Sequence, residues 1–311
     1  MTAVLRHELS SYFTNVTGYV FGAFLLLFAG IYTMVINLQS ASPYFEYVLM
    51  NMDFIFLIIV PILTMRVIAE ERRQKTDQLL YSLPLTMTQV ALGKYLAMLV
   101  IFLIPVAVIG VYPLVLTAFG AVYLPAAYGA LTGFFFLGAS LIAIGMFISS
   151  LTESQAVAAG LCFVVMLLNY FISSLASYVP STAFASFLCV AVCILVLGLI
   201  FRLLTRSGFA ALVLTILWWV TGVVERTAAS LFLLAAFLLC SGAPIQTVFS
   251  FRSADFQGLF PNLMEQLSLF DRFYEFVNGT FDLTAIVYYL TVIAVFVFLT
   301  VQSLEKRRWS E

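Results

Sequence analysis

Residues 48–84 decide the fold: an apolar run, VLMNMDFIFLIIVPILTMRVIA (48–69), passes directly into a charged segment, EERRQKTDQLLYSLP (70–84). A helix needs about 20 mostly apolar residues to cross the hydrocarbon core of a membrane, and the first part has that length. The dense charge that follows belongs in water. We therefore expect a membrane-spanning helix that ends in a structured loop at one membrane surface.

The composition extends this expectation to the whole chain. Of the 311 residues 63% are hydrophobic and 9% are charged, and the mean hydropathy is +1.10, whereas soluble domains are about half apolar and about a quarter charged. The net charge of −1 gives no basis for a nucleic-acid surface. These values predict an all-α, polytopic membrane protein with a single transmembrane domain over residues 1–311.

Eight stretches have the length and apolarity of a membrane span. They are 19–38, 48–69, 90–119 (interrupted by Pro105 and Pro113), 128–151, 155–175, 183–204, 209–224 and 283–304. Residues 227–251 are also apolar but contain Ser241, Gly242 and Pro244. We expect a re-entrant or interfacial segment there, with a full ninth span as the alternative.

The distribution of positive charge predicts the orientation. With both termini inside, eleven of the 14 Lys and Arg residues lie on cytoplasmic segments and only Arg226, Arg252 and Arg272 lie outside. Lys and Arg are enriched on cytoplasmic loops, so an N-in, C-in arrangement with an even number of spans follows.

Residues 1–16 form the first of three informative segments. Their apolar residues fall mostly at helical spacing and predict an amphipathic helix in the cytoplasmic interface; these residues are Leu5, Leu9, Tyr12, Phe13 and Val16. The helix is either a membrane-anchoring lead-in or a connecting helix that also contacts a partner.

Residues 70–89 are the most specific segment. After the charges Glu70, Glu71, Arg72 and Arg73, a short helix is predicted: it is capped by Thr76 and Asp77, carries Leu79, Leu80 and Leu83, and is stopped by Pro84. Thr86 and Gln89 then form a capping box for the next span. Exposed leucines rimmed by charge favour a docking site, and a basic loop folded onto lipid headgroups is the alternative.

The third segment, 252–282, carries apolar residues mostly three or four positions apart with acids between them. It predicts one or two amphipathic helices on the outer surface. They are either a membrane-lying connector or an outer gate or docking face for an extracytoplasmic partner.

Few polar residues lie within the predicted spans. Asp53 is expected near water at the outer end of the second span, and Asn169 and Tyr170 form the deepest polar pair. Ionisable groups inside spans are costly and often functional, so these three are candidate translocation-path residues. An interfacial acid and a helix–helix hydrogen bond are the simpler interpretations.

The chain resembles type 2 ATP-binding cassette (ABC-2) permeases, with the gliding-motility and copper-processing branch nearest. The resemblance covers residues 1–175 and 259–309 and rests on Glu70, Glu71, Arg72, Arg73, Leu79, Leu80, Ser82, Pro84, Gly93 and Lys94. Lys75 stands where the family usually has glycine, and Leu83 separates Ser82 from Pro84. Residues 183–251 do not match, which indicates an inserted pair of helices.

The resemblance implies a permease without catalytic activity of its own, in a bacterial plasma membrane. Separate ATPase subunits, which hold ATP and magnesium, would seat residues 76–83 as a coupling helix, while residues 1–16 pack nearby. A second permease copy or paralogue and an extracytoplasmic accessory subunit are further implied partners. The sequence contains no G-x-x-x-x-G-K-[ST] motif, so the chain itself needs no cofactor.

Two other functions are weighed against an ATP-driven exporter. The chain lacks the histidines that a zinc or Ser/His intramembrane enzyme needs, because its single histidine, His7, lies in the N-terminal segment. A secondary carrier or channel normally shows buried charges at mid-membrane and would leave residues 76–83 unexplained.

Overall fold

The computed structural model describes residues 2–14, 16–74, 86–179, 181 and 259–308. The chain divides into two compact units, 1–171 with 268–311, and 172–267. The described residues contain helices and no strand; in chain order these are α1 (Thr2–Thr14), α2 (Val16–Thr33), η1 (Met34–Gln39), α3 (Glu46–Met52), η2 (Asp53–Ile55), α4 (Phe56–Thr64), α5 (Ala69–Gln74), α7 (Met87–Ile109), α8 (Tyr112–Leu116), α9 (Leu124–Leu151), α10 (Gln155–Tyr178), α16 (Leu259–Leu267), α17 (Leu269–Val277) and α18 (Leu283–Arg308).

Six helical stretches among the described residues are long and apolar enough to cross a membrane. They are Val16–Gln39, Glu46–Gln74, Met87–Leu116, Leu124–Leu151, Gln155–Tyr178 and Leu283–Lys306. Each corresponds to one of the eight predicted spans. The other two, 183–204 and 209–224, and the apolar segment 227–251 lie outside the described residues.

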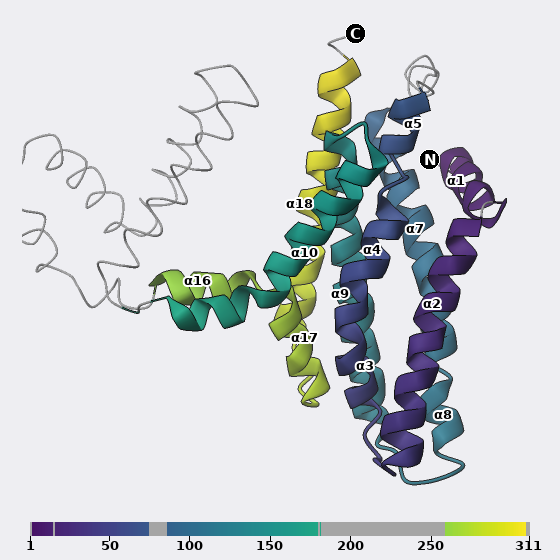
Figure 1. The fold of residues 1–311 in the computed structure, drawn as a ribbon, viewed down its shortest axis with the longest axis vertical. Helices are drawn as coiled ribbons and strands as arrows, with labels where there is room; N and C mark the ends of the chain where they lie inside the picture. The colour runs from purple at the N-terminus through teal and green to yellow at the C-terminus, as the bar shows by residue number, and fades with distance from the viewer. Residues whose placement is uncertain (1, 15, 75–85, 180, 182–258, 309–311) are drawn as a thin grey trace, which may run out of the picture. The chain divides into compact units, whose positions relative to one another are not determined.

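Helix α9 is central to the first unit, where it packs against α4, α7, α17 and α18 (Figure 1). Phenylalanine rings fill the space between three of these helices. The Phe56 ring on α4 lies 4.6 Å from Phe134 on α9 and 5.8 Å from Phe102 on α7. All three side chains are buried. Tilted and edge-on ring contacts of this kind add to the free energy gained from burying apolar surface.

The second span is not the continuous helix that the sequence predicts. It is α3, η2, α4 and α5 in series, and residues 65–68 form a turn between α4 and α5. Pro61 lies inside α4 and has no N–H to donate to the preceding turn. The turn at 65–68 needs polar partners from other helices, because backbone groups in a membrane protein have little water to bind.

The third span is interrupted at one of the two predicted prolines and not at the other. Helix α7 continues through Pro105, and the interruption falls after Ile109, where α8 begins with Pro113 in its first turn. Of the predicted capping box, the bond from Thr86 is confirmed, because the backbone N–H of Gln89 donates to the Thr86 hydroxyl at 3.3 Å.

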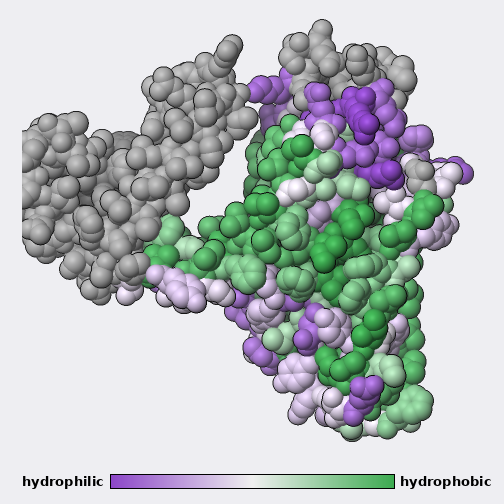
Figure 2. Space-filling model, viewed as in Figure 1, coloured by the Kyte–Doolittle hydropathy of each residue, from purple (hydrophilic) through white to green (hydrophobic). Residues whose placement is uncertain are grey.

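One end of the first unit is strongly polar, and we call it the charged end. It holds α1, α5, the start of α7 and the last turns of α18 (Figures 1 and 2). The Ser303 hydroxyl on α18 donates to the backbone oxygen of Ser150 on α9 at 3.2 Å, which fixes α18 there. The first and last described helices thus reach the same end of the first unit.

Two helices, α16 and α17, occupy the described part of the predicted outer amphipathic segment. Helix α17 begins where the Ser268 hydroxyl accepts the backbone N–H of Asp271 at 3.1 Å. Its apolar side is enclosed by the first unit and consists of Leu269, Phe270, Phe273, Phe276 and Val277. The apolar side of α17 therefore packs on the bundle.

Gly133 of α9 explains how α17 approaches the bundle so closely. A Cβ atom at Gly133 would lie 2.8 Å from the Phe276 ring. Small residues at helix interfaces allow this kind of approach in membrane proteins.

Candidate coupling site

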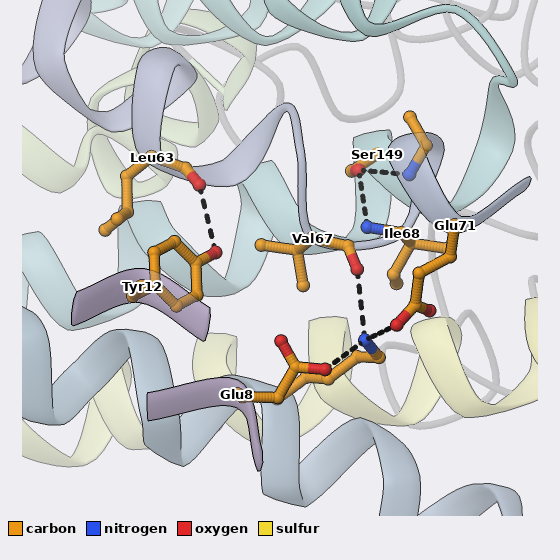
Figure 3. A network of polar contacts seen from close by, with 9 residues as sticks. Glu8, Tyr12, Leu63, Val67, Ile68, Glu71 and Ser149 are labelled. Carbon is orange, nitrogen blue, oxygen red and sulfur yellow. Dashed lines mark hydrogen bonds and ion pairs between the residues drawn. The ribbon is translucent and has the colours of Figure 1, made fainter. Parts of the chain in front are cut away.

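A buried lysine joins three helices at the charged end. The Lys94 ammonium on α7 lies 2.6 Å from Glu8 Oε1 on α1, 2.5 Å from Glu71 Oε1 on α5 and 3.2 Å from the Val67 backbone oxygen (Figure 3). Lys94 is 1% exposed. An ammonium group has three N–H donors, and the three acceptors satisfy all of them. A buried charge is tolerated only when it is paired and hydrogen-bonded in this way.

The residue before Lys94 makes the contact with α1 close. A Cβ atom at Gly93 would lie 3.0 Å from a methyl group of Val4. Gly93 and Lys94 therefore both contact α1. Gly93 leaves space for Val4, and Lys94 binds Glu8 one turn further along α1.

Helix α1 packs on the bundle with a side that includes Tyr12, one of the predicted apolar residues. Its buried side chains are Val4, Glu8 and Tyr12, at steps of four. The predicted face is only partly enclosed, because Leu5 and Leu9 are half-buried and Phe13 is 41% exposed. The reason is Glu8, which would be costly to bury alone but is stabilised by Lys94.

Tyr12 attaches the end of α1 to the second span. Its hydroxyl donates to the Leu63 backbone oxygen at 3.3 Å. Burial, followed by the negative charge of Glu8, raises the pKa of Tyr12 far above its usual range. The hydroxyl consequently keeps its proton and remains a donor.

The turn at 65–68 is stabilised from α9. The Ser149 hydroxyl accepts the backbone N–H groups of Ile68 at 3.3 Å and Ala69 at 3.2 Å (Figure 3). Together with the bond from Lys94 to the Val67 oxygen, these contacts replace hydrogen bonds that the interrupted helix lacks. Arg66, in the same turn, donates to the Thr17 hydroxyl of α2 at 2.7 Å.

The predicted charge cluster lies on α5 and reaches this site in part. Glu71 binds Lys94, and Glu70 lies 3.4 Å from Arg66 Nε. Arg72 is buried and Arg73 is exposed. The rest of the predicted coupling segment, Thr76, Asp77, Leu79, Leu80, Leu83 and Pro84, lies outside the described residues.

Three residues of the site, Glu8, Lys94 and Ser149, were not among the predicted site residues. Lys94 carries a usable signal, because it is a charged residue four positions inside the predicted span 90–119. Ser149 carries none, since a serine in an apolar helix is common and its partners are backbone atoms 80 and 81 residues away.

The three candidate translocation-path residues all contact α17. The Tyr274 hydroxyl donates to Asp53 Oδ2 at 2.6 Å, and the Leu269 backbone N–H donates to Asn169 Oδ1 at 3.1 Å. The Tyr170 ring lies edge-on to Phe270 at 5.0 Å. Asp53 is 2% exposed, so the expectation of an acid in contact with water is wrong.

The geometry defines a helical, multi-pass membrane protein whose charged end is tied together by one lysine. Comparison with family models then gives the family: the model described as ABC-2 family transporter protein matches residues 28–245, and the chain belongs to that family. It is therefore a transport protein of the permease type. No curated protein and no solved structure matches the chain.

The extent of the family match differs from that of the motif resemblance. The matched range includes residues 183–245, where the motifs show no likeness, and stops before 259–309, where they do. No group of three or more potential metal-ligating side chains occurs in the described part of the chain.

Proposed function

We propose that this chain is the membrane-spanning subunit of an ATP-driven exporter, moved by separate ATPase subunits that bind at the charged end. The observation that carries the proposal is the position of Lys94. In the sequence, residues 75–85 connect α5 to the start of α7, and Lys94 on α7 binds Glu71 on α5. One ammonium group thus connects the two flanks of the segment proposed to receive the ATPase.

The same ammonium group extends this connection to α1 through Glu8. A displacement of residues 76–83 by a closing ATPase dimer would move α5, the start of α7 and α1 together, as rigid-body transitions require. The turn at 65–68 lies between this group and α4 and is the place where such a movement could be absorbed. In the proposal ATP and magnesium are bound by the ATPase, and this chain is not catalytic.

The wider assembly is proposed on the motif resemblance and on charge. The charged end faces the cytoplasm of a bacterial cell, because Lys and Arg gather there. Two permease copies or paralogues surround one path, an extracytoplasmic subunit docks on the outer segment, and the nearest branch is that of the gliding-motility and copper-processing permeases.

The test is purification of the tagged chain from its native membranes in mild detergent, followed by mass spectrometry and an ATPase assay. A stoichiometric ATPase with turnover is expected. Changing Leu79 and Leu80 to Asp should remove it from the complex, because charged side chains do not enter an apolar groove, whereas changing both to Met should retain it. Full recovery of the ATPase with the Asp variant would contradict the proposal.

One observation favours a second candidate, a carrier without an ATPase. Asp53 is buried, and buried carboxylates in spans often serve ion-coupled transport. The same purification separates the two functions: a chain that transports in proteoliposomes with no ATPase present is a carrier.

A further inference from the structure

Asp53 is a buried carboxylate with little compensation. It begins η2, between α3 and α4 of the broken second span, and is 2% exposed. The Tyr274 hydroxyl binds one of its oxygens at 2.6 Å. Asp53 makes no ion pair with any residue that the structure describes. A negative charge in such surroundings is costly unless a positive charge comes to it.

Aromatic side chains lie close to Asp53 in the chain and through its hydrogen bond. Phe54, the next residue, lies edge-on to Tyr170 with ring centres 5.7 Å apart, and Tyr170 lies edge-on to Phe270 at 5.0 Å. Tyr274 adds a fourth ring beside the carboxylate. Phe54 is 46% exposed, so the ring cluster extends from Asp53 to the surface of the chain.

A carboxylate bordered by aromatic rings is suited to an organic cation. The carboxylate supplies the opposite charge, and ring faces attract ammonium and related groups through their quadrupole. Arg272 lies two residues before Tyr274 on α17. Its guanidinium lies 4.0 Å from the centre of the Tyr288 ring.

We propose that Asp53, Phe54, Tyr170, Phe270 and Tyr274 form a binding site for an organic cation with an apolar body. The inference rests on the proposed transport function in that it names the class of cargo. The Tyr274 hydroxyl occupies Asp53 when the site is empty and releases it when the cation arrives. Asp53 supplies the charge, and the rings bind the apolar part.

This exchange has a consequence that a purely structural contact lacks. Removing the carboxylate charge weakens cation binding, whereas removing the competing hydroxyl strengthens it. If the Asp53–Tyr274 hydrogen bond only held α17 in place, both substitutions would change cation binding in the same direction.

The experiment measures binding of radiolabelled tetraphenylphosphonium to the purified chain in detergent, without any ATPase. Saturable binding is expected, and excess triphenylphosphine oxide, which is uncharged, should not displace the label. Asp53→Asn should weaken binding by at least about tenfold and Tyr274→Phe should tighten it by about fivefold, as expected for hydrogen bonds and charge pairs in a dry site. Glu275→Gln, which removes an exposed carboxylate beside Tyr274, should change nothing.

Three results would overturn the proposal: no saturable binding to the unaltered chain, equal binding by Asp53→Asn, or equal or weaker binding by Tyr274→Phe. If Asp53→Asn does not fold, Tyr274→Phe alone decides, since it retains the carboxylate. Failure of the proposed ATPase coupling leaves this measurement intact, because no ATPase takes part. Cation binding without a co-purifying ATPase would support the site while contradicting the exporter.

Discussion

Replacement of Lys94 by Met tests whether the lysine holds the charged end together. The substitution keeps an unbranched, apolar side chain of similar length and removes the ammonium group. Glu8 and Glu71, which bind that group from two sides, then lose the positive charge that they share. Their mutual repulsion and the lost hydrogen bonds should loosen α1 from α7.

The cost follows from burial. Removing one partner of a buried ion pair typically costs about 3–5 kcal/mol. The Glu8 side chain is 12% exposed and that of Glu71 is 28% exposed, so water screens the second more than the first. We therefore expect the lower part of the range, about 3 kcal/mol, which corresponds to a change on the order of 100-fold in the population of detached α1.

The assay measures detachment of α1 directly. Val4, 8% exposed and packed on Gly93, is changed to Cys in a chain whose four native cysteines are replaced by Ala, and its rate of reaction with a thiol reagent is measured. Lys94→Met should raise that rate. A triple variant with Glu8→Gln and Glu71→Gln should restore slow labelling, since the two carboxylates that Lys94 binds are then neutral as well. Unchanged labelling in Lys94→Met would refute the reasoning, and so would fast labelling in the triple variant.

Two further predictions concern packing on α9 and are read from unfolding of the purified chain in detergent. Ser149→Ala should lower the free energy of unfolding by about 1–3 kcal/mol, because two buried N–H groups lose their acceptor. Ser150→Ala is the control and should lower it by less, because the Ser150 hydroxyl donates to Phe147 O of its own helix. Equal losses would contradict the assigned role of Ser149. Gly133→Ala should lower it by about 1–3 kcal/mol, because Phe276 must move. Gly129→Ala, which meets nothing within 4 Å, should be neutral, and a neutral Gly133→Ala would mean that α17 does not pack as described.

The sequence predicts those parts of the fold that depend on local pattern. Six of the predicted spans coincide with apolar helices, because a run of about 20 apolar residues in lipid has few alternatives to a helix. The cap at Thr86 is confirmed for a similar reason, since its two partners are three residues apart.

The parts that it does not predict depend on contacts between distant residues. Nothing near 65–68 in the sequence indicates a turn, because its stabilising groups come from Ser149 and Lys94. The burial of Asp53 depends on Tyr274, 221 residues away. The apolar pattern of residues 1–16 does not indicate that Glu8 is buried, because its partner Lys94 is 86 residues away.

The pairing of Glu8 with Lys94 has a consequence for biosynthesis. The two residues are 86 positions apart, so α1 is made well before its binding surface exists. Until α7 has left the ribosome and entered the bilayer, Glu8 has no counter-charge and α1 has no groove at Gly93. Helix α1 is thus synthesised before α7 and docks only once the third span is in place, so its docking depends on correct insertion of that span.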